Sequence, residues 1–240
     1  MKIDEASCAG CGECVPYCTM GAIRLDEVAV IDQDECVDCG ACLRSGVCPT
    51  DCITYEPAPW PRALRAAFSD PGSAHPDTGI IGRGTTEMKT NDVTGIYKSG
   101  WVGIGIELGR PCLGTNFRDV EKVAQAMAKL GAQFASKNPL TFLMEDKSTG
   151  KLKAEVLDEK ALSAIVECLF PLEKLPDVLT SLKDVSKDVD TVFTVECISR
   201  CEPDGSIPAE RMLSDSGVPY YINGKTNVGL GRPRAEGESQ

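Results

Sequence analysis

Nine of the chain's 13 cysteines lie between Cys8 and Cys52, and their spacing constrains this segment more than any other feature does. They include two runs of the pattern C-x-x-C-x-x-C, which begin at Cys8 and, 28 residues later, at Cys36. Such a run lets three sulfurs converge from one tight loop, and a glycine follows the second cysteine where the loop turns hardest. A further cysteine, Cys18 or Cys48, follows each run. The segment is therefore an internal repeat with two sets of four thiols.

Disulfides and zinc are the alternative uses of so many thiols. The opening MKIDEASCAGC has no apolar signal segment, so we expect a cytoplasmic protein with reduced cysteines. A single C-x-x-C pair would leave zinc open, but the runs are complete and the chain has one histidine, His75. Thiolates are the soft ligands that iron-sulfur clusters require. Since no run lacks a fourth cysteine, we predict two [4Fe-4S] clusters rather than a three-iron centre.

The runs Cys8-Ala-Gly-Cys11-Gly-Glu-Cys14 and Cys36-Val-Asp-Cys39-Gly-Ala-Cys42 resemble those of bacterial-type two-cluster ferredoxins. In that family the remote cysteine of each run ligates the other cluster. The resemblance implies two ligand sets, the first made of Cys8, Cys11, Cys14 and Cys48, and the second of Cys36, Cys39, Cys42 and Cys18. It also implies that the clusters supply much of the folding free energy of so small a domain, which should be largely unfolded without them.

Two departures from the family pattern affect the choice of ligands. Thr19 follows Cys18 where the family has proline, and the five residues 43–47, instead of three, precede Cys48. The insertion raises the question of whether Cys52 is the ligand. In the repeat, however, Cys52 takes the place of Ala22, which is a packing position. We therefore predict that Cys48 is the ligand and that Cys52 is a buried thiol.

The charge is concentrated in the same segment. Residues 1–56 contain eleven acidic side chains and three basic ones, and the whole chain has a net charge of -11. An acidic surface repels nucleic acid and steers the protein towards basic docking patches. No run of about 18 apolar residues could cross a bilayer. We therefore expect a redox partner protein, either a flavoprotein or a metal-containing oxidoreductase, and neither nucleic acid nor a membrane span.

Residues 57–100 are expected to form a linker followed by a glycine-rich arm. Prolines at 57, 59 and 61 surround Trp60 and predict a stiff connection with an anchoring indole. Segment 79–95 carries Arg83 and Lys89 among glycines, but no strand precedes it and it lacks the Walker lysine context. A structural or docking arm is therefore favoured over an anion site.

Residues 101–200 have periodicities that predict a β-α-β-β-α-β domain of the α+β class. The expected strands are 101–108, 140–144, 161–170 and 191–198, and the expected helices are 116–130 and 172–185. With both helices on one face of an antiparallel sheet, this order is the ferredoxin-like sandwich. The Arg110-Pro111 junction and the helix entrance at 171–175 resemble those of ligand-sensing ACT-type domains. Residues 201–240 are expected to be a C-terminal extension with a disordered end.

Four cysteines remain outside the repeat: Cys112, Cys168, Cys197 and Cys201. We expect the first and third strands to run parallel and the fourth to oppose them, which would separate Cys112 and Cys168 from Cys197. No third cluster is therefore predicted, and Cys168 and Cys197 are expected to be core thiols. Cys112 is expected to be a packed loop cysteine, with a reactive thiol at a helix N-terminus as the alternative.

Together these features predict an electron carrier, or an electron-transfer subunit of an oxidoreductase complex, without catalytic activity of its own. Its C-terminal domain would serve for docking, homo-oligomer formation or control by a ligand. One alternative is an iron-sulfur reductase with a substrate site at segment 79–95 or near Cys112. A ligand-sensing redox regulator that uses residues 110–115 is the other.

Overall fold

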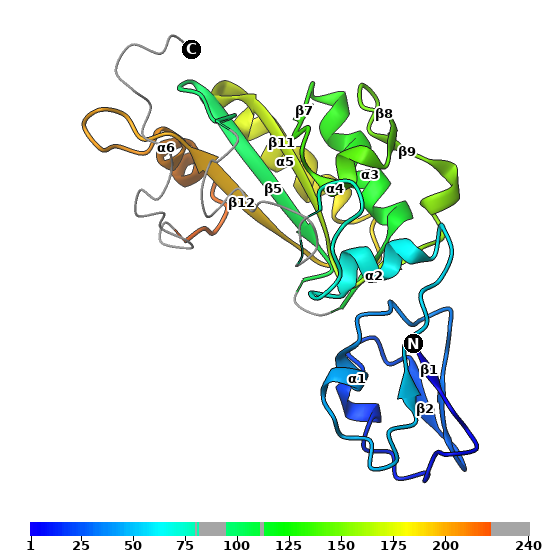
Figure 1. The fold of residues 1–240 in the computed structure, drawn as a ribbon. Helices are drawn as coiled ribbons and strands as arrows, with labels where there is room; N and C mark the ends of the chain where they lie inside the picture. The colour runs from blue at the N-terminus through cyan, green and yellow to red at the C-terminus, as the bar shows by residue number, and fades with distance from the viewer. Residues whose placement is uncertain (80, 82–94, 111–112, 222–240) are drawn as a thin grey trace.

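The computed structural model describes residues 1–79, 81, 95–110 and 113–221. Figure 1 shows a small N-terminal body and a larger C-terminal body, with helix α2 (Ala63–Ser69) at their junction. The N-terminal body, residues 1–56, contains β1 (Lys2–Ile3), η1 (Val15–Tyr17), β2 (Ile23–Leu25), β3 (Ala29–Ile31), α1 (Ala41–Arg44) and β4 (Ile53–Thr54).

Short strands and cysteines make up the N-terminal body. Strands β2 and β3 form a hairpin around Asp26 and Glu27, in which they pair antiparallel with Ile23 opposite Ile31. Strand β1 pairs with β4 at the other end of the segment. The buried cluster of this body consists of Met1, Cys14, Ala22, Ile23, Ala29, Ile31, Cys36, Cys42, Cys52 and Ile53. Cysteine side chains thus take many of the positions that larger apolar residues fill in an ordinary core.

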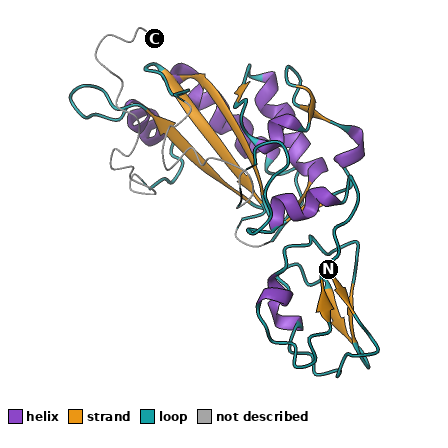
Figure 2. Cartoon of the chain, in the orientation of Figure 1, coloured by secondary structure: helices purple, strands orange, loops and turns teal. Residues whose placement is uncertain are grey.

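The C-terminal body, residues 63–221, is built on a four-stranded antiparallel sheet in the order β12-β5-β11-β7. Figure 2 shows its long strands beside the helices. After α2 its elements are β5 (Trp101–Leu108), β6 (Thr115–Asn116), α3 (Phe117–Lys129), β7 (Gln133–Phe134), α4 (Pro139–Phe142), β8 (Met144–Asp146), β9 (Lys151–Leu152), η2 (Ala154–Val156), β10 (Lys160–Ala161), β11 (Ala164–Pro171), η3 (Leu172–Lys174), α5 (Leu175–Val185), β12 (Phe193–Ser199) and α6 (Pro208–Asp215).

Helix α3 follows the predicted pattern closely. The Asn116 side chain caps it by accepting a hydrogen bond from the Asp119 backbone N–H at 2.8 Å. Its apolar face, which includes Phe117, Val123 and Met127, is fully buried against the sheet and α5. The predicted helix at 172–185 is also present, as η3 followed by α5.

The strand expected at 140–144 is wrong. Residues 139–142 form the helical turn α4, in which Pro139 occupies the first helical position and the Asn138 side chain accepts a hydrogen bond from Leu140 N–H at 2.8 Å. The fourth strand of the sheet is instead β7, which pairs with β11 through Cys168 and Phe134. A short apolar run does not distinguish a strand from a buried helical turn, and here the capping residues decide.

The direction expected for the third strand also needs correction, whereas the expected opposition of the fourth strand to the first is confirmed. Strand β11 runs antiparallel to β5, and so does β12, so that Cys168 and Cys197 both lie opposite Ile104 rather than at opposite ends of the sheet. Cys168 is nevertheless a core thiol, as predicted, and Cys197 packs against the same core. Burial raises the pKa of both thiols, that of Cys197 to about 12. Cys201 is exposed, whereas Cys112 lies outside the described residues.

A helix follows the proline-rich part of the stretch that joins the two bodies. Residues 63–69 form α2, whose Leu64 and Phe68 belong to the core of the C-terminal body. Before it, the Trp60 indole N–H donates to the Glu155 carboxylate at 3.0 Å and so tethers the proline-rich stretch. Of segment 79–95, only residues 79, 81 and 95 are described, and Arg83 and Lys89 lie outside. Within the described ranges, none of the helices combines the length and apolarity needed to cross a bilayer.

Replacing Phe117 by alanine is expected to destabilise the C-terminal body by about 3–5 kcal/mol, because it empties a fully buried aromatic site. The Phe117 ring meets that of Phe68 edge to face at 5.3 Å, so α2 would lose packing as well. Urea unfolding measures the loss. The exposed Val218→Ala variant serves as control and should change stability by less than about 0.5 kcal/mol. Equal stability of the two variants would contradict this account of the core.

Candidate iron-sulfur site

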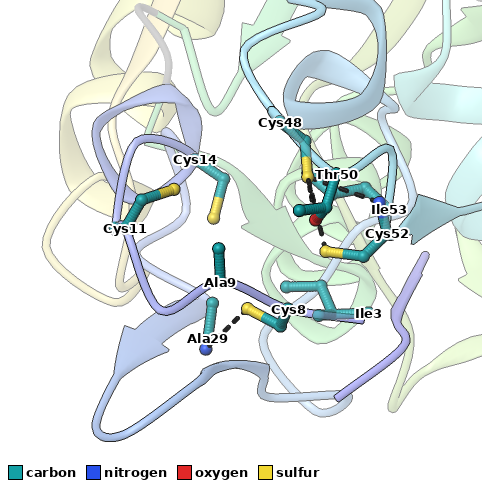
Figure 3. A pocket seen from close by; sticks show the side chains of 11 residues that line it. Ile3, Cys8, Ala9, Cys11, Cys14, Ala29, Cys48, Thr50, Cys52 and Ile53 are labelled. Carbon is teal, nitrogen blue, oxygen red and sulfur yellow. Dashed lines mark hydrogen bonds between the residues drawn. The ribbon is translucent and has the colours of Figure 1, made fainter. Parts of the chain in front are cut away.

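Five cysteines line a hollow in the N-terminal body. Figure 3 shows Cys8, Cys11, Cys14, Cys48 and Cys52 around it. Cys11 is exposed, whereas Cys14 and Cys52 are buried. The fold thus brings together the four thiols that the sequence predicts for one cluster. It also brings Cys52 to the same wall, although the sequence predicts that this thiol is not a ligand.

Backbone N–H groups point at several of these sulfurs. Ala22 N–H donates to Cys18 Sγ at 3.2 Å, and Cys52 N–H donates to Cys48 Sγ at 3.3 Å. Each bond joins a remote cysteine to the residue four positions later, so the two halves of the repeat use the same contact. Ala29 N–H approaches Cys8 Sγ at 3.5 Å. Hydrogen bonds of this kind stabilise thiolates and, once a cluster is bound, tune its potential.

Cys48 and Cys52 are neighbours whose thiol pKa values are shifted in opposite directions. Their sulfurs are 3.3 Å apart. Hydrogen bonding from the Thr50 side chain, together with the Cys52 N–H, lowers the pKa of Cys48 to about 7. Burial raises the pKa of Cys52 to about 11. Near neutral pH, Cys48 is therefore much closer to the thiolate form that binds iron.

The second set of cysteines lies deeper. Cys36 and Cys42 are buried, and Cys18 and Cys39 are half-buried. Gly40, with a φ of 71°, turns the loop so that α1 begins directly after it and carries Cys42. Burial raises the pKa of Cys36 and raises that of Cys42 to about 11. Because these thiols are protonated near neutral pH, iron must displace their protons when it binds. Cluster assembly at this site should therefore become more favourable as the pH rises.

The Cys36 loop also faces the C-terminal body. Asp38, which is buried, pairs with the Met1 amine and lies 3.4 Å from the Arg62 guanidinium. Met20, close to Cys18 in sequence, packs so tightly on Gly114 that a Cβ there would lie 2.4 Å from its Cε. The second set of cysteines is therefore at the inner end of the N-terminal body, and the exposed Cys11 belongs to the other set.

The donor chemistry fits iron-sulfur clusters. Two groups of thiols lie in tight loops, and backbone N–H groups reach three of the sulfurs. In the described part of the chain, no three His, Cys, Asp or Glu side chains converge as they would around a single metal ion. A cubane cluster needs thiolates around a body larger than one metal ion, and Cys8, Cys11, Cys14 and Cys48 line one common hollow.

Replacing Gly10 by alanine is expected to remove about half of the bound iron, because it should destroy the site of one cluster of two. Gly10 has a φ of 64°, and a Cβ there would lie 2.4 Å from the Glu27 carbonyl oxygen. Gly21 is the matched control, since its φ is 63° but no atom lies within 4 Å of its Cβ position. Gly21→Ala should keep both clusters. Iron analysis of the two variants gives the answer, and equal iron contents would refute the steric explanation.

This repeat of cysteine loops defines an iron-sulfur domain of the two-cluster type. Residues 7–52 match the sequence profile of the family described as 4Fe-4S dicluster domain. Through this segment the chain belongs to the dicluster ferredoxins; it carries two [4Fe-4S] clusters, and its chemistry is ferredoxin-type electron transfer.

Curated proteins similar to the chain include ferredoxins and one component of a larger complex. Ferredoxin-3 of Rhodobacter capsulatus is 33% identical over 81 residues, covering 23% of this chain and 78% of that protein. The ferredoxin-like protein in vnf region of Azotobacter chroococcum is 45% identical over 60 residues, covering 22% and 89%. A subunit of the ion-translocating oxidoreductase complex of Methanosarcina acetivorans is 46% identical over 50 residues, covering 20% and 18%.

The family match at residues 7–52 lies within the N-terminal body, and each of the three relatives matches less than a quarter of the chain. The chain spans less than a fifth of the length of the Methanosarcina protein. No solved structure matches the chain significantly. The family match does not extend to the C-terminal body.

Arg62, which directly precedes α2, and Arg65, within α2, are the part of the site that the sequence did not indicate. Arg62 donates to the Gln33 carbonyl at 2.6 Å, and Arg65 reaches the same turn. Nothing in the spacing of these arginines relates them to cysteines about thirty residues earlier. The α2 sequence, Ala-Leu-Arg-Ala-Ala-Phe-Ser, could have been recognised as a helix, and that would have been the only available signal.

Proposed function

We propose that the chain is an electron-transfer protein, or an electron-transfer subunit, that passes low-potential electrons to or from a partner oxidoreductase. The observation that carries the proposal is the pair of cysteine sets, one at the exposed end and one at the inner end of the N-terminal body. The bound clusters supply one-electron chemistry. The residues of the chain hold them, donate N–H groups to their sulfurs and set the surrounding charge.

The ligand sets belong to this proposal. We assign Cys8, Cys11, Cys14 and Cys48 to the outer cluster and Cys18, Cys36, Cys39 and Cys42 to the inner cluster. The shared hollow of the first four supports the outer set. The choice of Cys48 rather than Cys52 as the fourth ligand is supported by their pKa values, which are lowered to about 7 for Cys48 and raised to about 11 for Cys52. Free thiols are required for this role, which fits a reducing, cytoplasmic location.

A partner protein can approach the exposed end. Cys11 lies at the surface, next to Gly10, which contacts the turn at Glu27. Asp26 and Glu27 are exposed, and so is Glu13. A partner with a basic patch would be steered to this end, and the acidic surroundings would lower the potentials because reduction adds negative charge. A flavoprotein or a metal-containing oxidoreductase meets this description.

For the C-terminal body we infer a β-α-β-β-α-β sandwich that serves in docking, homo-oligomer formation or regulation. The sheet order β12-β5-β11-β7, with α3 and α5 between its strands in the chain, supports the inference. The likeness to one component of a named oxidoreductase complex supports a role within a larger assembly. The proposed substrate sites at segment 79–95 and Cys112 lie almost wholly outside the described residues, so the reductase alternative rests on sequence alone.

The experiment that tests this function is anaerobic affinity purification, followed by electron transfer between the chain and the protein that co-purifies. Asp26→Asn/Glu27→Gln should slow that transfer at low salt, and the difference from wild type should shrink at high salt. Glu173→Gln, an exposed acid on the C-terminal body, is the matched control and should leave the rate unchanged. Substrate turnover by the purified chain alone with reduced viologen would contradict the proposal.

A further inference from the structure

The turn that leads into Cys36 is held by one buried arginine from the other body. Arg65, in α2, is 6% exposed. Its Nη1 lies 3.0 Å from the carbonyl oxygen of Gln33, 3.0 Å from that of Asp34 and 2.9 Å from that of Cys36. The Asp32 carboxylate shapes the same turn by accepting Asp34 N–H at 3.0 Å. A single guanidinium thus binds the carbonyl of Cys36, the first cysteine of the second run, and two carbonyls of the turn before it.

The same guanidinium has a carboxylate partner in the C-terminal body. Arg65 Nε donates to Glu159, whose side chain is 12% exposed. Glu159 is held in turn by its backbone, because its carbonyl oxygen accepts Phe117 N–H at 3.1 Å at the start of α3. The pair is therefore largely shielded from water and salt, and its charges act over longer distances than surface charges do.

Charge at this position must affect the inner cluster. Each one-electron reduction adds one unit of negative charge at a cluster, taken from a one-electron reductant such as dithionite, and no bond forms or breaks. A cation beside Cys36 stabilises the reduced state relative to the oxidised state, and an anion does the reverse. Arg65 and Glu159 therefore act in opposite senses on the same potential.

We propose that Arg65 is a positioning residue through which the C-terminal body sets the geometry of the Cys36 loop and the reduction potential of the inner cluster. Arg65 raises this potential, and the negative charge of Glu159 lowers it. This inference rests on the proposed ligand set of Cys18, Cys36, Cys39 and Cys42. It gives the C-terminal body a direct role in electron transfer at a distance from any docking surface.

A second arginine also joins a cysteine loop of the inner cluster to the C-terminal side of the junction. Arg44, two residues after Cys42, donates to the Cys39 carbonyl oxygen and also pairs with Asp70 at 2.7 Å. Asp70 ends α2. The Arg44 guanidinium is about half exposed, however, so solvent screens it more strongly than it screens Arg65. Arg65 is accordingly expected to have the larger effect.

The test is a potentiometric titration of the holoprotein, followed by electron paramagnetic resonance, for Arg65→Met, Arg65→Lys and Glu159→Gln. Arg65→Met should reduce about tenfold the ratio of reduced to oxidised inner cluster at a fixed ambient potential, a downward shift of about 59 mV. Glu159→Gln should shift the same step upward. Arg65→Lys keeps the charge and should stay near wild type. The other one-electron step should move less in every variant.

A structural role alone would not give shifts of opposite sign, so shifts in one direction, equal shifts of both steps or no shift would overturn the proposal. If Arg65→Met fails to hold its clusters, an upward shift in Glu159→Gln still supports the proposal, and an unchanged potential overturns it. Arg211→Gln removes a cation in α6 that is 92% exposed and should leave both steps unchanged. Iron analysis of the wild-type protein separates the two failures: absent clusters overturn the proposed function, whereas unshifted potentials in loaded protein overturn this inference alone.

Discussion

Removing the iron with a chelator is expected to unfold residues 1–56 while the C-terminal body stays folded. The N-terminal body has strands of two or three residues, and its buried cluster contains cysteines whose sulfurs are meant for iron. So small a core cannot offset the conformational entropy of folding without the clusters. The C-terminal body has an independent core that includes Ile104, Phe117 and Phe170.

Hydrogen exchange before and after chelation measures this difference. Backbone amides of residues 1–56 should lose nearly all protection, and those of β5 and β11 should keep theirs. Heating the chelated protein should still give one cooperative transition, which belongs to the C-terminal body. Retained protection around β2 and β3 without iron would contradict the account.

Replacing Cys52 by alanine is expected to leave both clusters in place. Ala22 already occupies the equivalent position in the first half of the repeat, where its N–H reaches Cys18 as that of Cys52 reaches Cys48. Burial keeps Cys52 protonated near neutral pH, because it raises the pKa of this thiol to about 11. Cys48, with a pKa lowered to about 7, is the thiolate.

The double variant Cys48→Ala/Cys52→Ala is compared with Cys52→Ala to test whether Cys48 is the ligand. With neither thiol available, the outer cluster loses its fourth ligand, and the iron content should fall below that of Cys52→Ala, by one iron if the three remaining thiolates keep a three-iron centre and by four if the whole cluster is lost. The double variant is needed because the two sulfurs are 3.3 Å apart, and Cys52 could take over from Cys48 in a single variant. A loss of iron in Cys52→Ala alone would show that the ligand is misassigned.

Much of the N-terminal body follows from sequence because its chemistry is local. Eight cysteines at fixed spacings, and the glycine after the second cysteine of each run, specify the loops directly. The deep burial of Cys52 was also predictable, since the repeat aligns it with Ala22. Which of the neighbouring sulfurs binds iron depends on hydrogen bonds and burial that only a folded chain has.

The secondary structure of the C-terminal body was harder to predict where it depends on capping residues or on contacts between distant parts of the chain. Periodicity identified β5, α3, β11 and α5, which are long and amphipathic or buried. It failed at residues 139–142, where the Asn138 cap and Pro139 make an apolar run helical. It also missed α2, whose role depends on Glu159, 94 residues away from Arg65 in sequence. Contacts of that range leave no local signal.

Metal and sulfide analysis of anaerobically purified protein, combined with electron counting during dithionite reduction, tests the central claim most directly. The account predicts eight irons per chain, four for each cluster, with matching acid-labile sulfide and no stoichiometric zinc. It also predicts two one-electron reduction steps at low potential. Zinc in place of iron, or a chain that holds one cluster and accepts one electron, would contradict it.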